Sequence, residues 1–191
     1  MDFNFYLKQG INHILDLAGY DHMLFVIALC ALYELRQWKK VLILLTAFTL
    51  GHSVTLLLSG LNMLRLPQDL IETLIPITIF LTALNNILFY NKMRSSKTNY
   101  NYFVALVFGF IHGAGFSNFY RSMLADIEES VVLPLLAFNI GIELGQIVIV
   151  AVFFAMYYLI QLFASFPHQR WNVAVSIFAA TISGLMIIGA I

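Results

Sequence analysis

Long apolar segments make up most of this chain, and they restrict its fold more than any other feature. A helix needs about 20 mostly apolar residues to cross the hydrocarbon core of a bilayer. The apolar runs are continuous rather than alternating, which favours helices over the strands of a closed barrel. We therefore predict an all-α integral membrane protein, a single polytopic domain over residues 1–191. Its six predicted transmembrane helices cover approximately residues 19–34, 41–61, 69–90, 101–121, 131–161 and 171–191.

The composition excludes several classes of protein. Charged residues make up 10% of the chain and hydrophobic residues 61%, whereas a soluble domain carries roughly 25% charged residues. A soluble enzyme is therefore excluded, and the lipid bilayer is the expected partner. A net charge of zero without a basic stripe excludes a nucleic-acid-binding protein. The single cysteine, Cys30, excludes a disulfide framework and a metal site built of thiolates. An oligomer or a second membrane protein as partner stays open.

Residues 1–18 differ from the six apolar segments. Apolar residues recur at helical spacing from Phe3 to Ala18, and polar residues from Asn4 to Asp16 occupy another face. This amphipathic pattern predicts a short helix that lies in the membrane interface. The alternative is that the segment extends the first span. It lacks the basic region and clean apolar core of a signal peptide, so we expect it to belong to the mature fold.

The basic residues predict the orientation of the spans. Seven of the ten Lys and Arg residues lie in the linkers after the first, third and fifth spans, and three lie on the opposite side. Basic residues in short loops concentrate on the cytoplasmic side of a membrane. Both termini are therefore expected outside.

Polar side chains inside the spans are the candidates for function. A charged group at the bilayer centre costs about 2.5 to 3.5 kcal/mol on insertion scales. Asp21 and His22 lie in the first span, His52 in the second, His112 in the fourth and Glu143 in the fifth. The three histidines and Glu143 each lie roughly 15–18 Å from a span end at 1.5 Å per residue. That depth is close to the middle of a ~30 Å core.

Side chains from four helices at one depth predict a shared metal site. Imidazole and carboxylate ligands suit divalent ions such as Zn²⁺, Ni²⁺ and Co²⁺, and the lack of thiolates argues against Cu⁺. Other polar residues are expected to support the site: Thr49, Ser53, Glu72, Asn139 and Gln146. Of these, Glu72 lies near the outer end of its span, where it would be an access ligand or an interfacial carboxylate. The alternative is that these groups only form hydrogen bonds between helices.

Two glycine pairs predict close helix packing. Gly109 and Gly113 are four residues apart, as are Gly141 and Gly145, and small residues at this spacing let helices approach closely in membranes. The second pair lies opposite Glu143. We therefore expect the fifth span to contact a neighbour behind while Glu143 faces the site in front.

Four sequence blocks, in order, resemble the HupE/UreJ family of small bacterial membrane proteins. They are His13 with Gly19–Phe25, Thr46–Leu56, Ile111–Phe116 and Phe138–Gln146. The resemblance implies a nickel or cobalt permease-like protein of the bacterial inner membrane. It further implies that His13, Asp21 and His22 are first-span metal ligands and that His112 belongs to a second metal motif.

The chain departs from the family's pattern at two places. The family spaces the first histidine and the Asp-His pair by five residues, whereas seven separate His13 from Asp21. Nickel-transporting members carry a second His-Gly followed by an acid after the first His-Gly, and here Gly115, Phe116 and Ser117 follow instead. These departures indicate a divergent branch of the family.

Three functions follow from these patterns. The favoured one is a divalent transition-metal permease, with His22, His52, His112 and Glu143 at the midplane. In that hypothesis Asp21, His13 and Glu72 lead to the site from outside. The second is an intramembrane zinc-type metallohydrolase, with Glu143 or Asp21 as general base. The third is a non-catalytic accessory protein in which polar groups only join helices. In that hypothesis, replacing His52 by Asn or Gln would leave both folding and function intact.

Overall fold

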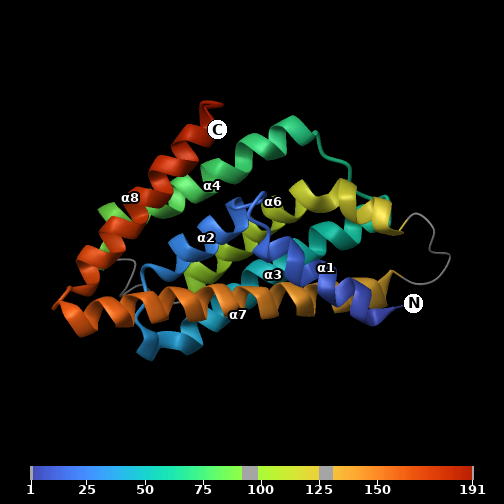
Figure 1. The fold of residues 1–191 in the computed structure, drawn as a ribbon. Coiled ribbons are helices and arrows are strands. Elements are labelled where there is room, and N and C mark those ends of the chain that lie inside the picture. The colour runs from blue at the N-terminus through green and yellow to red at the C-terminus, as the bar shows by residue number, and fades with distance from the viewer. Residues whose placement is uncertain (1, 92–98, 125–130, 191) are drawn as a thin grey trace.

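The computed structural model describes residues 2–91, 99–124 and 131–190. These residues form an all-helical bundle (Figure 1). The basic residues Lys92, Arg94 and Lys97, used above for orientation, lie outside the described residues. The helices are α1 (Phe3–Leu15), α2 (Asp21–Cys30), the 3-10 helix η1 (Leu35–Gln37), α3 (Trp38–Gly60), α4 (Gln68–Leu88), α6 (Asn99–Leu124), α7 (Val132–Phe163) and α8 (His168–Ile187).

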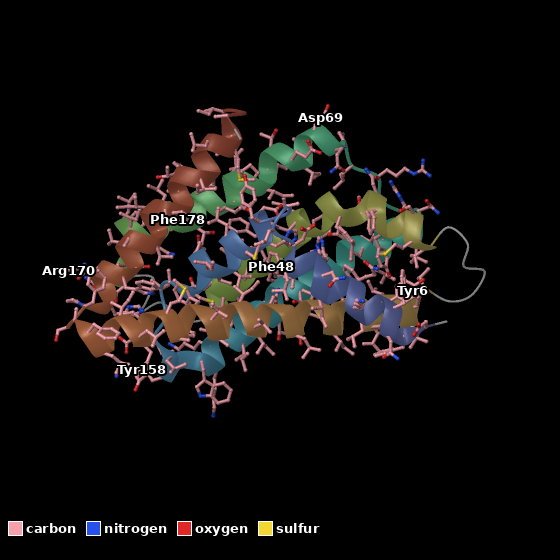
Figure 2. The ribbon with its side chains drawn as sticks, in the orientation of Figure 1. Tyr6, Phe48, Asp69, Tyr158, Arg170 and Phe178 are labelled. Atoms are coloured by element: carbon pink, nitrogen blue, oxygen red, sulfur yellow. The ribbon has the colours of Figure 1, made fainter. Side chains whose placement is uncertain are left out.

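Among the described residues, five helices are long and apolar enough to cross a membrane. They are η1 with α3, then α4, α6, α7 and α8, and they correspond to the second to sixth predicted spans. Large apolar side chains such as Leu50 and Val152 are exposed on them, as is Phe178, labelled on α8 in Figure 2. A soluble protein would not expose so many of these side chains. The membrane character predicted from the apolar segments is therefore supported.

The first predicted span, 19–34, is not one membrane-length helix. Its helix, α2, has ten residues, which at 1.5 Å per residue is about 15 Å and half of a ~30 Å core. Residues 16–20 separate it from α1, which has 13 residues and is N-capped by the Asp2 carboxylate. In place of the six expected membrane-length helices, the described residues form five, together with the two shorter helices α1 and α2. The predicted boundary near residue 19 lies in this break, whereas the predicted end of the span at residue 34 lies beyond the end of α2 at Cys30.

Helix α1 packs along the first half of α7, and the two helices run in the same direction (Figure 1). Leu7 contacts Gly141, and Ile14, two turns later, contacts Gly145. A Cβ atom on Gly141 would lie 2.2 Å from the Leu7 carbonyl oxygen, and one on Gly145 would lie 2.0 Å from Ile14 Cγ2. The glycine pair predicted to form a packing seam therefore does so, and the seam faces α1.

The backbones of helices α3 and α6 also lie in close contact. A Cβ atom on Gly51 would lie 2.0 Å from the Leu106 carbonyl oxygen, and one on Gly109 would lie 2.0 Å from the Phe48 carbonyl oxygen. At Gly113 the corresponding distance to the His52 carbonyl oxygen is 2.6 Å. Only glycine fits at these positions, and the contact places His52 and His112 in neighbouring turns.

Helix α4 packs against α6 and α2. Ile71, Ile75 and Ile79 of α4 are buried in an apolar cluster with Phe25 of α2 and Phe48 of α3. Helix α8 packs against the outer side of α4 (Figure 1). The site described below is therefore enclosed by α1, α2, α3, α4, α6 and α7.

Replacing Gly109 by alanine is expected to lower the thermal unfolding temperature of the protein in detergent. The new Cβ would overlap the Phe48 carbonyl oxygen and force α3 and α6 apart, and overpacking of this kind costs about 1 to 3 kcal/mol. Gly184→Ala is the matched control, because a Cβ there meets only Phe80 at 3.9 Å. Equal unfolding temperatures of the two variants, followed by tryptophan fluorescence, would contradict the close contact.

Candidate metal centre

Four of the five histidines gather at one place inside the bundle, each from a different helix. His13 comes from α1, His22 from α2, His52 from α3 and His112 from α6. The ring of His22 contacts the other three, with centroid distances of 4.6 Å to His13, 5.8 Å to His52 and 5.1 Å to His112. His13 also contacts His52 at 5.6 Å. The predicted site residues His13, His22, His52 and His112 therefore lie together, and their binding of a metal stays a prediction.

The ligand atoms of this cluster form two overlapping groups of three. One group holds His13, His22 and His52, and the other holds Asp21, His22 and His112. Within each group the candidate ligand atoms all lie within 4.8 Å of one another. His22 belongs to both groups. Three such atoms are the number that a catalytic or exchangeable zinc-type site supplies from protein.

The histidine nitrogens at this place lack the partners that buried polar groups normally have. Nε2 of His13, Nε2 of His22, both ring nitrogens of His52 and Nδ1 of His112 are buried and have no hydrogen-bond partner among the described residues. Buried polar atoms in proteins are nearly always hydrogen-bonded, and an ion or water is one of the explanations for exceptions. The donor set therefore fits a divalent transition-metal ion.

Asp21 orients His22. Oδ1 of Asp21 accepts a hydrogen bond from Nδ1 of His22 at 3.0 Å and another from the His22 backbone N–H at 2.9 Å. A proton on Nδ1 leaves the lone pair on Nε2, the buried nitrogen without a partner. This carboxylate–histidine arrangement is the one that fixes the tautomer of metal-binding histidines. Asp21 therefore has a positioning role in addition to its place among the ligand groups.

Thr78 of α4 orients His112 in the same way. Its hydroxyl donates to the Ile75 carbonyl oxygen at 2.7 Å, so its oxygen accepts from Nε2 of His112 at 2.9 Å. That bond places the proton of His112 on Nε2 and leaves the lone pair on Nδ1. Each of the two histidines thus directs one lone pair away from its orienting partner.

Aromatic rings surround the cluster. Phe116 stands closest, 3.8 Å from the His13 ring centroid, and it stacks on Phe138 at 5.2 Å. Phe25 and Phe48 contact His112 at 4.9 and 5.2 Å. Figure 2 shows Phe48 in the middle of the bundle. The rings exclude water and lower the local polarity, which strengthens any electrostatic interaction at the site.

The structure does not bring every predicted site residue to the cluster. Glu143 is half-buried on α7 and lies in neither ligand group, and Asn139 is likewise half-buried outside them. Glu72 is exposed on α4. The seam at Gly141 and Gly145 faces α1, so Glu143, on the opposite side of α7, is turned away from His13. The expectation that Glu143 faces the site in front therefore differs from the arrangement found.

The remaining supporting residues lie beside the cluster. Thr49 of α3 donates a hydrogen bond to Oε1 of Gln146 at 3.2 Å, and both side chains are buried. Ser53 donates to the Thr49 carbonyl oxygen within α3. These contacts join α3 to α7 and do not reach the histidines directly.

The sequence reasoning missed the aromatic shell and the role of Thr78. A signal was present, because Phe48 precedes His52 by four residues, and Phe108 and Phe116 flank His112 at the same spacing. Residues four apart share one face of a helix. That His13 joins His52 had no signal in the residues, because α1 and α3 meet only through the tertiary structure.

Replacing His52 by leucine is expected to leave the thermal stability of the chelator-treated protein unchanged or to raise it. Leucine has a similar volume and removes two buried nitrogens without partners, and such unsatisfied groups cost about 1 to 3 kcal/mol each. Thr49→Val is the control, because it removes a buried hydroxyl that does have a partner and should destabilise. A larger loss in His52→Leu than in Thr49→Val, measured by thermal unfolding in EDTA, would contradict this description of His52.

Comparison with known proteins identifies the family of this chain. The sequence model of the family described as HupE / UreJ protein matches residues 1–190. No curated protein sequence gives a significant match. No solved structure does either. Since the family match covers essentially the whole chain, including all five residues of the two ligand groups, this protein belongs to the HupE/UreJ family.

Proposed function

We propose that this protein is a membrane permease for a divalent transition-metal ion of the nickel, cobalt or zinc type. The observation that carries the proposal is the pair of ligand groups buried among apolar helices, with imidazole nitrogens that have no partner among the described residues. Imidazole with carboxylate is the ligand set of such ions. Cys30 lies in the apolar core and belongs to neither ligand group, so a thiolate-preferring ion is disfavoured.

The arrangement of the ligands favours a transport function rather than catalysis by an ion that stays bound. A structural or catalytic zinc site uses three or four protein ligands around one point. Here five candidate ligand residues extend from His13 through His22 to His112, with His22 between the two ends. Ligands in succession are what an ion needs in order to enter a site on one side and leave it on the other.

The membrane topology that fits this function has six crossings in one domain. In it, α1 and α2 together form the first crossing, because about 20 Å and about 15 Å of helix are together long enough to span a ~30 Å core. The parallel course of α1 and α7 supports this reading. Both termini would then lie outside the bacterial inner membrane, with most basic linker residues inside. Of the two alternatives from the sequence, this topology favours the one in which residues 2–18 extend the first span. It disfavours a helix that lies in the membrane interface.

The discontinuous first crossing has a functional counterpart in transporters. Broken membrane helices there place binding sites near the bilayer midplane. The break at residues 16–20 lies directly between His13 and the Asp21–His22 pair. Irregular backbone at that depth is tolerated where it borders a polar cavity, and an open pocket does border it, lined by Asn12, His13 and Asp16 among others.

An intramembrane metallohydrolase is the second candidate. The observation that favours it is that His13, His22 and His52 form a three-histidine group beside the same open pocket. Such a group leaves a coordination position for water. A hydrolase would retain its ion and move none across a membrane, which separates the two functions in the experiment below.

Full-length protein in liposomes is expected to take up Ni²⁺, Co²⁺ or Zn²⁺ from the external solution, and His22→Ala is expected to abolish uptake. His22 belongs to both ligand groups, so its loss leaves no complete group. Uptake is followed with the radioactive ion or an internal metal-sensitive dye, and binding is measured by calorimetry in detergent.

The matched control is His168→Gln, because His168 is the fifth histidine and lies outside both ligand groups, bonded to Tyr90 and to the Tyr33 carbonyl oxygen. It should bind and transport like the wild type. Wild-type protein that binds none of the three ions would refute both metal functions. Binding without uptake would refute the permease and favour the hydrolase.

A further inference from the structure

We infer that the transported ion passes through two successive positions that share His22 and that exclude each other. The outer position is the group of His13, His22 and His52, and the inner position is the group of Asp21, His22 and His112. This inference rests on the proposed function and specifies the route of the ion through the protein.

Mutual exclusion follows from the chemistry of one imidazole. A neutral imidazole has a lone pair on only one of its two nitrogens, since the other carries the proton. His22 is buried, with 4% of its surface exposed, and the Asp21 carboxylate accepts from its Nδ1. It can therefore ligate an ion in one of the two positions at a time. An ion in the outer position must leave it before the inner position gains its third ligand.

The outer position borders an open pocket of about 690 Å³. Its walls come from α1, the break that follows α1, and α6, and polar groups of Gln9, Asn12 and Asp16 line it together with His13. His13 is half-buried, but its Nε2 atom is fully buried and without a partner among the described residues. His13 therefore links the pocket to the buried cluster. Asp16, exposed in this wall, supplies the negative charge that attracts a cation.

Phe116 closes this side of the cluster. It also lines the open pocket, and its ring lies against His13 with centroids 3.8 Å apart. It is held there by the stacked ring of Phe138. An ion that moves from the pocket to the outer position has to displace this ring.

A second pocket lies beyond the inner position, between α2, α4 and α6, and it has polar groups on its α4 side. Thr78 contacts His112, and Thr82 lies one turn further along α4, where its hydroxyl donates to the Thr78 carbonyl oxygen at 2.8 Å. Thr82 lines the second pocket with Asn85 and Asn86. Its volume of about 40 Å³ exceeds the space that one water molecule needs.

Aromatic rings also close the inner side. Phe108 lines the second pocket and contacts Phe25, which in turn contacts His112. The cluster therefore has one pocket on each side. Phe116 lies beside His13 in the wall of the outer pocket, and Phe108 and Phe25 lie between the second pocket and His112. This is the arrangement of a transport site closed on both sides, with binding at the centre.

Single replacements at the two ends test the shared position. His13→Leu leaves the inner group complete, and His112→Leu leaves the outer group complete. Each variant is expected to bind one Ni²⁺ per chain in detergent with a Kd within roughly tenfold of the wild type, about the loss expected from one polar partner. Neither is expected to support uptake into liposomes. Asn replacements at the same positions serve if a Leu variant does not fold, as judged by its thermal unfolding.

Thr82→Val tests the inner side of the route. It removes a hydroxyl from the second pocket and is expected to slow Ni²⁺ uptake roughly tenfold, with Kd unchanged. Thr73→Val is the matched control on the same helix, because Thr73 makes the same kind of bond, to the Asp69 carbonyl oxygen, on an exposed surface. It should transport like the wild type.

Several outcomes would overturn the inference while leaving the permease intact. Two ions per wild-type chain would show that both positions fill at once. Loss of binding in both His13→Leu and His112→Leu would show a single site that uses all the ligands. Uptake that is unchanged in Thr82→Val would place the inner route elsewhere. Wild-type protein without binding would refute the proposed function itself, which is a separate result.

Discussion

The contact between the backbones of α3 and α6 is the constraint on which the rest of the site depends. At Gly51, Gly109 and Gly113 the two helices approach so closely that a single Cβ atom would overlap a carbonyl oxygen of the other helix. Apolar side chains cannot drive such association in lipid, so close van der Waals contact through small residues has to hold the helices together. The same contact puts His52 beside Gly113, and Gly113 directly follows His112 in the chain. Metal-ligating side chains from two helices are thereby brought to one level.

A second glycine seam adds the remaining ligands. Gly141 and Gly145 let α1 lie against α7, which carries His13 to the cluster, and the break after α1 returns the chain at Asp21 and His22. The resulting group is costly for a protein that binds nothing, because buried nitrogens without partners lower stability. Asp21 and Thr78 each use one nitrogen of a histidine and leave the other available. The cluster is therefore oriented for a ligand and is not a hydrogen-bonded core.

Position along a helix fixes depth, so the sequence could place the histidines at one level. His52 and His112 lie well inside α3 and α6, as the apolar segments around them indicate. Depth alone does not give the direction of the Glu143 side chain, because rotation about the helix axis decides it. The sequence shows correctly that Glu143 lies opposite Gly141 and Gly145, but it does not show which of those faces turns inward. In the structure the glycine face turns toward α1 and the ligands, so Glu143 is directed elsewhere.

The sequence by itself determined the membrane character, the helical class, most helix boundaries, the family resemblance and the residue types of the candidate site. Those properties depend on composition, on local periodicity and on distance along one helix, all of which can be read from the residues in order. The tertiary structure decided that His13 joins His52, that Phe116 covers His13 and that His22 is common to two ligand groups. These depend on how helices rotate and approach one another, and that is set by contacts between residues far apart in the chain.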